Sequence, residues 1–181
     1  MEIRVIRLIL VSVIAFLGTT LAAAAEVTAN GFLVRHERVI AAPPARVYEA
    51  LVGQIGFWWN PQHTYTGDSK NLSIDPRAGG CFCERLPNGG VEHMRVVALK
   101  TNEMLRLIGS LGPLQASGVT GSMTWLISPA ERGSKLTLGY SVGGFIAGGF
   151  EGIAPAVDRV IGEQVDRLKR YIETGTPSEA K

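Results

Sequence analysis

The chain has 181 residues, 46% of them hydrophobic, and a formal net charge of +2 at pH 7. A surface that follows nucleic acid needs a clear excess of positive charge, so we expect no nucleic-acid partner. The charged residues are dispersed and give no indication of electrostatic attachment to a membrane. No internal repeat divides the sequence, and its length suits a single domain.

The first 25 residues have the layout of a secretory signal peptide. Two arginines precede an apolar stretch at residues 8–17, and Ala23–Ala25 are the small residues that a signal peptidase requires. We predict cleavage near Ala25 and a periplasmic or secreted protein without a stable membrane anchor. The alternative is an uncleaved anchor, because residues 8–25 are nearly uncharged and just long enough to cross a bilayer.

The rest of the chain predicts one domain at residues 33–175, between a flexible stretch at 26–32 and a tail at 176–181. The domain opens with a strand at 33–41. A short amphipathic helix follows, because two prolines suit a helix start and apolar residues then recur at helical spacing from Val47 to Ile55.

A series of strands occupies the middle of the domain. Apolar and polar residues alternate with period two from Val119 to Ser128 and from Lys135 to Val142. This pattern predicts antiparallel strands with one buried face. The expected strands are residues 71–75, 81–86, 91–100, 104–110, 119–128 and 135–142.

Residues 153–173 predict a long amphipathic helix that ends at Gly175. One helix of this kind rarely fills the space over a large curved sheet, so we expect a cavity between the two. Gly162 flanks the apolar face, where glycine costs about 1 kcal/mol relative to alanine. Space for a neighbouring strand or for a ligand would explain this glycine.

This order of elements resembles the helix-grip fold of the START-related (SRPBCC) superfamily, typified by the birch-pollen-allergen-like proteins. The segments that carry the resemblance are ERVIAAPPARVYEALV, GFWWNP, PRAGGCFCE and the closing helix. The tryptophan pair and the GG-x-F motif are most similar to the branch named for the activator of a heat-shock-protein ATPase. The resemblance implies an α+β fold, in which a curved antiparallel sheet of six to seven strands wraps a long C-terminal helix.

Members of this superfamily include lipid and hormone carriers, polyketide cyclases and domains without an established activity. The resemblance therefore implies a ligand cavity in which indole N–H and phenol O–H groups orient the bound molecule. The expected lining residues are Trp58, Trp59, Tyr65, Phe82, Met94, Met123, Trp125, Tyr140, Phe145, Val157 and Ile161.

Candidates for catalysis are few. His63 and Tyr65 lie in a loop beside the tryptophans and could act as acid or base at a cavity mouth. His36 is expected at the surface or at a sheet edge. The GYSVG match to a nucleophile elbow predicts no hydrolase, because no histidine follows Ser141 in the order that this mechanism needs.

Cys81 and Cys83 lie one residue apart, and His93 follows ten residues later. Residues i and i+2 of a regular strand have Cα atoms roughly 6.5 Å apart, so a disulfide requires a local distortion. Zinc sites use four ligands and C-x-x-C turns, which are missing here, although copper is harder to exclude. We expect neither a metal nor any other cofactor.

The register of this hairpin decides where His93 points. A type I′ turn at Asn88-Gly89 would place Glu84 opposite His93. A type I turn at Pro87-Asn88 with a bulge at Gly89 would place Cys83 opposite His93 and Cys81 opposite Arg95. We favour the second register, because proline suits that turn. It predicts a buried face with Phe82 and Met94, and it leaves the cysteines and His93 on the other face.

The function predicted from the sequence is the binding of a small hydrophobic or amphipathic ligand between sheet and helix, with no protein partner indicated. A cyclase- or hydratase-type enzyme using the same cavity is the first alternative, and a wholly apolar lining would rule it out. A protein-interaction module without a cavity is the second alternative.

Overall fold

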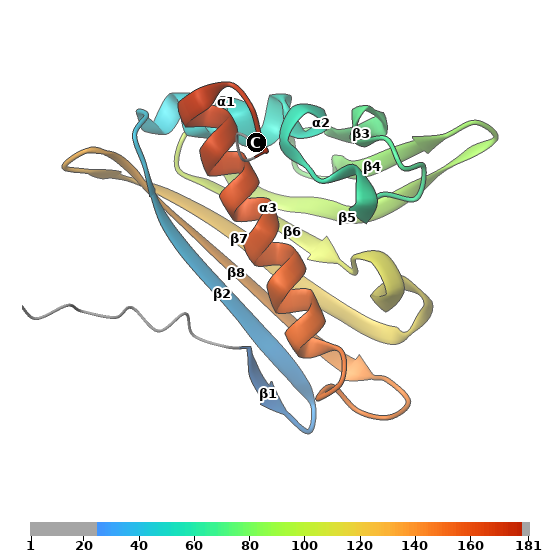
Figure 1. Ribbon diagram of the computed structural model, residues 1–181. Coiled ribbons are helices and arrows are strands. Elements are labelled where there is room, and N and C mark those ends of the chain that lie inside the picture. The colour runs from blue at the N-terminus through green and yellow to red at the C-terminus, as the bar shows by residue number, and fades with distance from the viewer. Residues whose placement is uncertain (1–24, 179–181) are drawn as a thin grey trace, which may run out of the picture.

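The computed structural model describes residues 25–178, so the predicted leader lies outside this range except for Ala25. Within these residues, no helix combines the length and the apolar character needed to cross a bilayer. The described part of the chain contains one antiparallel sheet and helices packed against one of its faces (Figure 1).

The sheet has eight strands in the order β1-β2-β8-β7-β6-β5-β4-β3. Consecutive strands pair along most of the sheet, and β2 crosses over to pair with β8. The strands are β1 (Glu26–Thr28), β2 (Gly31–Ile40), β3 (Leu72–Ile74), β4 (Cys81–Leu86), β5 (Gly89–Lys100), β6 (Met104–Gly109), β7 (Gly118–Ala130) and β8 (Gly133–Phe145).

The α+β helix-grip fold predicted from the sequence is confirmed, with a strand count slightly above the expected six to seven. The difference arises at residues 26–32, which were expected to be flexible. Instead β1 pairs with the beginning of β2, with Val27 opposite Phe32. Phe32 is buried and packs its ring against Phe150, so the core extends to this end of the sheet.

Three α-helices cover the concave face, namely α1 (Pro44–Gly53), α2 (Ile55–Trp58) and α3 (Ala154–Thr174). Helix α3 crosses the sheet diagonally, and α1 and α2 lie across the end of the sheet where α3 finishes (Figure 1). Pro155 occupies the first turn of α3, and Gly175 ends the helix in the left-handed conformation. Short 3-10 helices are η1 (Pro61–His63), η2 (Ser69–Asn71) and η3 (Gly112–Ala116).

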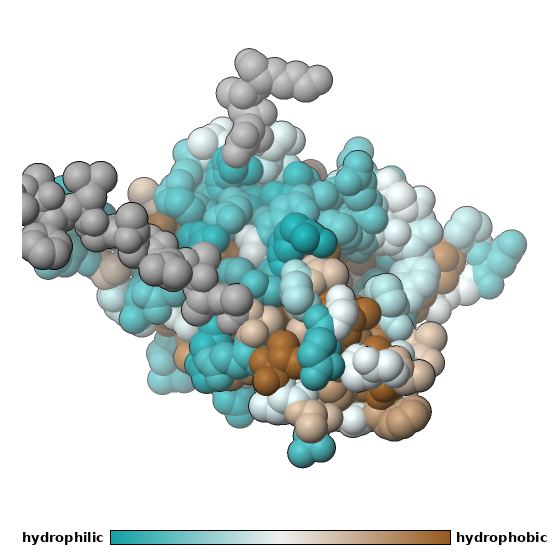
Figure 2. All heavy atoms as spheres, turned by 60° about the horizontal axis from the view of Figure 1, so that its bottom comes forward, coloured by the Kyte–Doolittle hydropathy of each residue, from teal (hydrophilic) through white to brown (hydrophobic). Residues whose placement is uncertain are grey.

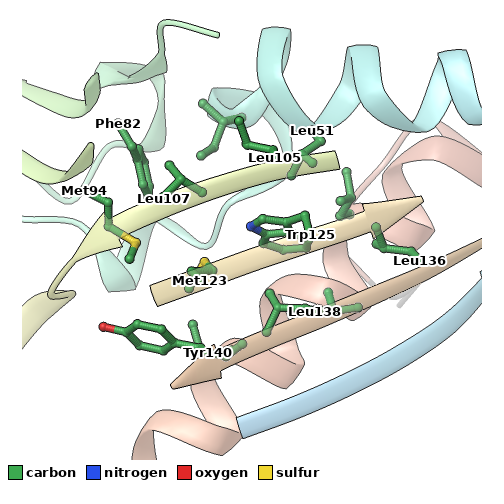
Figure 3. Close-up of a cluster of buried hydrophobic side chains, with 14 of the residues drawn as sticks. Leu51, Phe82, Met94, Leu105, Leu107, Met123, Trp125, Leu136, Leu138 and Tyr140 are labelled. Atoms are coloured by element: carbon green, nitrogen blue, oxygen red, sulfur yellow. The ribbon is translucent and has the colours of Figure 1, made fainter. Parts of the chain in front are cut away.

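The core lies between the sheet and the helices and contains large side chains from β4 to β8 and from α1 (Figure 3). Trp125 is 3% exposed and meets the ring of Trp58 edge-on, with ring centroids 6.4 Å apart. These two indoles fill much of the space between the centre of the sheet and α2. The helix-grip space is therefore largely packed in its centre.

Polar contacts fasten the C-terminal half of α3 to β2 and to the residue that follows it. Arg38 donates from Nε and Nη2 to the carboxylate of Asp166, at 2.6 and 3.0 Å. Nearer the end of the helix, Glu173 accepts from the backbone N–H of Ala41 at 2.9 Å, and Lys169 donates to the carbonyl of Val39 at 2.8 Å. These bonds set the position of α3 over the sheet.

His36 lies at a sheet edge as expected, because β1 pairs only with residues 31–33 of β2, but the side chain is not at the surface. Its side chain is 12% exposed and its Nε2 lies 2.9 Å from Asp158 Oδ1 of α3. A Cβ on Gly162 would lie 2.7 Å from His36 Cε1, so the missing side chain at Gly162 makes room for the imidazole. A neighbouring strand, and not a ligand, thus explains this glycine.

Candidate ligand cavity

A cavity of about 400 Å³ lies beside the N-terminal half of α3, against the end of the sheet formed by β3, β4 and β5. Residues 59–65 and 111–114 close its sides. Most of the lining is apolar and consists of Trp59, Leu72, Phe82, Leu111, Pro113, Leu114, Ile153, Ala156, Val157, Val160 and Ile161. The other lining residues are Gln62, His63, Thr64, Tyr65, Gly112 and His93.

The outer surface near the start of α3 is also partly apolar. Viewed toward this end of the molecule, hydrophobic residues gather next to a predominantly polar region (Figure 2).

The structure divides the predicted lining residues into two groups. Trp59, Tyr65, Phe82, Val157 and Ile161 line the cavity. The others, apart from Phe145, are buried in the core outside the lining, namely Trp58 and four residues that Figure 3 labels, Met94, Met123, Trp125 and Tyr140. Since these large side chains fill the centre of the sheet, the cavity is confined to one end of it.

Phe145 does not face the cavity, and the prediction for this residue is wrong. Its side chain is 74% exposed at the end of β8. Side chains alternate between the two faces of a strand. Tyr140 and Val142 point into the core, so Phe145 shares the outer face with the exposed Ser141.

The indole N–H and phenol groups expected to orient a ligand bind the protein itself. Trp58 Nε1 donates to the carbonyl of Ala50 at 2.9 Å, and Trp59 Nε1 donates to the carbonyl of His63 at 3.1 Å. Burial raises the pKa of Tyr140 to about 12, so its hydroxyl stays protonated. Ligand orientation therefore depends on other polar groups of the lining.

His63 and Tyr65, the two candidates for acid or base, lie at the outer side of the cavity. His63 Nε2 lies 3.3 Å from Oε2 of Glu163 on α3, and both side chains are about one-third exposed. The Tyr65 side chain is 54% exposed, and its hydroxyl donates to Gln115 Oε1 at 2.9 Å. Both residues therefore frame the opening and leave the interior to other groups.

A buried histidine–glutamate pair lies at the inner side of the cavity, where His93 belongs to the lining and Glu84 contacts it from outside the lining. His93 Nε2 lies 3.2 Å from Glu84 Oε2, and their side chains are 6% and 0% exposed. Glu84 also accepts the backbone N–H of Tyr65 at 3.0 Å and that of Thr66 at 2.6 Å. The pair thus ties β4 and β5 to the loop that carries the mouth residues.

Burial and hydrogen bonding shift the pKa of each member of this pair in opposite directions. Burial disfavours the charge on Glu84, but the donors from Tyr65, Thr66 and His93 outweigh it and hold the pKa of this carboxyl below its usual range. Burial lowers the pKa of His93, and the nearby carboxylate only partly offsets it. Near pH 7 the pair is therefore a carboxylate and a neutral imidazole.

The sequence analysis missed Glu84 and placed His93 on the wrong face. A register shift between Phe82 and Cys83 pairs Phe82 with Met94 and Cys83 with Glu92. His93 is the extra residue at this bulge, and both it and Met94 are buried. The inward orientation of Glu84 could have been predicted, because Glu84 lies two residues after the inward-pointing Phe82 and such residues share a strand face.

The hairpin turn is also tighter than predicted. Leu86 pairs with Gly89, so Pro87 and Asn88 form a two-residue turn. The bulge inserts one extra residue in β5 and so offsets the shorter turn. Cys81 therefore still pairs with Arg95 as expected. Because the shift occurs within the strands, counting outward from the turn could not locate it.

Cys81 and Cys83 form a disulfide at this bulge. Their Cα atoms are 5.4 Å apart, compared with the roughly 6.5 Å of a regular strand, so the chain has the local distortion that a bridge requires. Among residues 25–178, no three histidine, cysteine or acidic side chains gather as metal ligands would. Cys81, Cys83 and His93 thus do not assemble into a metal site in this structure.

Comparison with known proteins identifies the family. A family model described as polyketide cyclase / dehydrase and lipid transport matches residues 32–173. The chain belongs to this family. The match covers the strands from β2 onward, the helices and the cavity, and it supports the predicted SRPBCC relationship. No curated protein matches the chain significantly.

Solved structures share the family's fold at low sequence identity. An uncharacterized protein from Rhizobium leguminosarum is 18% identical with a TM-score of 0.61, over 83% of this chain and 97% of that chain. A conserved protein of unknown function from Enterococcus faecalis is 15% identical with a TM-score of 0.60, over 87% and 82%.

DynU16, from the dynemicin biosynthetic locus, is 20% identical with a TM-score of 0.61. The match covers 82% of this chain and 49% of DynU16. At such identities these likenesses show the fold alone.

Proposed function

We propose that this protein binds a small apolar or amphipathic molecule in the cavity beside α3. The observation that carries the proposal is a cavity of about 400 Å³ whose lining is mainly apolar. Small-molecule sites commonly have volumes of about 300–1,000 Å³ and combine apolar walls with a few polar groups. Here Val157, Val160 and Ile161 of α3 supply an apolar wall, and His93 supplies a polar group opposite.

We further propose that the protein acts in the periplasm or outside the cell. Two observations support this location. The first is the order of basic, apolar and small residues over positions 1–25. The second is the disulfide between Cys81 and Cys83, because disulfides persist in oxidising compartments.

Within the family, we place the chain near the branch named for the activator of a heat-shock-protein ATPase. The motifs that support this placement are Trp58-Trp59 and Gly79-Gly80-x-Phe82. We do not extend the co-chaperone role to this protein. An exported protein would be separated from an ATP-dependent partner inside the cell.

A cyclase- or hydratase-type enzyme using the same cavity is the second candidate. The observation in its favour is that the lining is not wholly apolar, since it includes His63, Tyr65 and His93. General acid–base catalysis needs a titratable group within hydrogen-bond reach of the ligand. The presence of a cavity argues against the remaining alternative, an interaction module with a fully packed interior.

Binding of N-phenyl-1-naphthylamine, an uncharged probe that fluoresces in apolar surroundings, tests the proposed cavity. We expect saturable binding to the wild type and its loss in Ala156→Phe, because Ala156 lines the cavity and a phenyl group would occupy it. Ala147→Phe is the matched control, because Ala147 is exposed in the loop before α3 and outside the lining. Equal binding by both variants would refute the cavity as the site.

Native mass spectrometry of protein recovered from the periplasm of its own host tests ligand and location together. We expect the mass of a chain that begins at Glu26, accompanied by a bound small molecule that Ala156→Phe lacks. Recovery of the uncleaved chain from the membrane fraction would contradict the proposed export. A consistently ligand-free mass, with no thermal shift across a panel of lipids, would contradict the proposed binding.

A further inference from the structure

His93 has the geometry of a base that faces the proposed ligand. Its ring lines the cavity, yet the residue is only 5% exposed. The ring centroid lies 5.0 Å from that of Phe82 and 5.9 Å from that of Tyr65, which hold the imidazole between them. Its orientation is thus set before any ligand enters.

Glu84 determines which nitrogen of His93 carries the proton. The carboxylate receives three hydrogen-bond donors, which are the backbone N–H groups of Tyr65 and Thr66 and the Nε2 of His93. An ionised carboxylate can only accept hydrogen bonds. The proton of the neutral imidazole therefore resides on Nε2, and Nδ1 carries a lone pair.

Nδ1 has no hydrogen-bond partner among residues 25–178, and it is not sealed off from solvent space. The buried side-chain atoms that make no hydrogen bond in this range are Tyr48 Oη and Asp158 Oδ1, and the latter is held by its ion pair with His36. Since Nδ1 is not one of them and His93 lines the cavity, we place this lone pair within reach of a molecule in the cavity.

The charged and titratable groups around His93 favour a neutral, basic imidazole. Glu84 faces it from β4 and Tyr65 from the loop after η1. His63, in the same cavity, is paired with Glu163 on the outer side. His93 therefore combines an apolar setting with one buried carboxylate that can stabilise a positive charge on the ring.

We propose that His93 is a general base for a molecule bound in the cavity, with Glu84 as its positioning residue. In this step a C–H or O–H bond of the ligand breaks, its electron pair stays on the ligand, and the proton forms an N–H bond at Nδ1. The imidazolium is neutralised by the Glu84 carboxylate until the proton returns to the ligand. The inference rests on the proposed binding cavity and adds proton transfer to it.

The base-promoted opening of 5-nitrobenzisoxazole tests this inference without knowledge of the natural ligand. The base removes the ring C–H proton, the N–O bond breaks, and the product is a nitrile with a coloured phenolate. We expect the wild type to accelerate the reaction and His93→Phe to lose roughly 100-fold of the rate, the usual contribution of a positioned base. Phenylalanine preserves the aromatic packing against Phe82 and Tyr65.

The pH profile distinguishes a base from a structural residue. In the wild type, the rate should rise with pH and level off below pH 6.5, where the pKa of a buried His93 lies. Glu84→Gln should slow the reaction and move this plateau to lower pH, because Glu84 raises the pKa of His93. The matched control is Glu92→Gln, an exposed carboxylate paired with Arg95, which should leave the rate unchanged.

Binding of N-phenyl-1-naphthylamine by the same proteins separates the two proposals. Probe binding without rate acceleration in the wild type would overturn the inference and leave the binding function intact. Loss of rate in His63→Phe but not in His93→Phe would also overturn it. If His93→Phe fails to bind the probe, the pH dependence of the wild-type rate tests the role of His93 instead. A rate that levels off above pH 6.5, or that does not level off, would contradict the assignment of His93 as the base.

Discussion

Single residues in this protein are matched across elements that are far apart in the sequence. Gly162 of α3 is the clearest case, because the absence of a side chain there lets the imidazole of His36 on β2 lie under the helix and reach Asp158. A pairing between residues much closer in the sequence joins His93 to Glu84 of the neighbouring strand, which sets the tautomer of the imidazole. Each pairing fixes the position of a helix or a wall of the cavity.

We predict that Gly162→Ala lowers the stability of the protein even though alanine favours helices. The gain in helix propensity is about 1 kcal/mol. The new methyl group would lie 2.7 Å from the His36 ring and push it from its place, and overpacking of this kind costs about 1–3 kcal/mol. We expect a melting temperature lower by a few degrees, measured by circular dichroism.

Gly53→Ala is the matched control for this variant, because a Cβ at Gly53 in the last turn of α1 meets no atom within 4 Å. This control should be neutral or stabilising. The double variant His36→Ala/Gly162→Ala should recover part of the loss. A rise in melting temperature for Gly162→Ala alone would contradict the prediction, because it would show that the His36 ring moves aside without destabilising the protein.

At the scale of elements, the β4–β5 hairpin carries the inner wall of the cavity. The register shift at Phe82/Cys83 turns both His93 and Met94 toward the interior. The disulfide between Cys81 and Cys83 spans this point on β4, while Phe82 between them packs edge-on against Trp59. The bridge therefore constrains the segment that positions Phe82 in the cavity wall.

We predict that the two cysteines are oxidised in the native protein and that the bridge contributes modestly to stability. A thiol assay in denaturant should detect no thiol before reduction and both cysteines after it. Because the closed loop is very short, Cys81→Ser/Cys83→Ser should lower the free energy of unfolding by only about 1–2 kcal/mol. Reductant should destabilise the wild type but leave the double variant unaffected. Free thiols in protein isolated without reductant would contradict the prediction.

At the scale of the whole molecule, one core joins the sheet to all three helices, and the ionisable Glu84 and His93 lie inside it. Both groups have pKa values below those of the free side chains. In the unfolded chain each would bind a proton at a higher pH than in the folded protein. Acid therefore favours unfolding through both groups.

We predict that the free energy of unfolding, measured with urea, falls as the pH decreases from 7 to 4. The part due to His93 is fully present above pH 6.5 and is lost as the pH falls toward its lower folded pKa. The part due to Glu84 follows below about pH 4.5. His93→Phe should therefore show a flatter dependence just below pH 6.5, and an unchanged slope there would argue against a neutral buried imidazole.

Much of the fold could be predicted from local patterns. The period-two alternation located β7 and β8, and helical spacing with Gly175 located α3 to within about one residue at each end. These patterns are reliable because they repeat over many residues and depend on burial of one face. β1 was missed because a strand of three residues is too short to show a period.

The candidate site could be predicted only in part. Trp59, Phe82 and Val157 line the cavity. Their aromatic or apolar side chains and their positions in the sequence pattern both predicted that they face inward. Trp58 and Trp125 have the same character but fill the core. Whether an apolar side chain fills space or borders it depends on its neighbours in three dimensions.

The sequence by itself determined the α+β class, the long C-terminal helix and the apolar side of the strands, because these features depend on a periodic pattern of apolar residues within one segment. The tertiary structure decided that the imidazole of His93 lines the cavity. A single register shift reverses the face that a strand residue occupies, and here the shift lies within the β4–β5 pairing, where the turn sequence does not specify it. For this reason the folded structure was needed to establish Glu84 as the partner of His93 and to place His93 in the cavity wall.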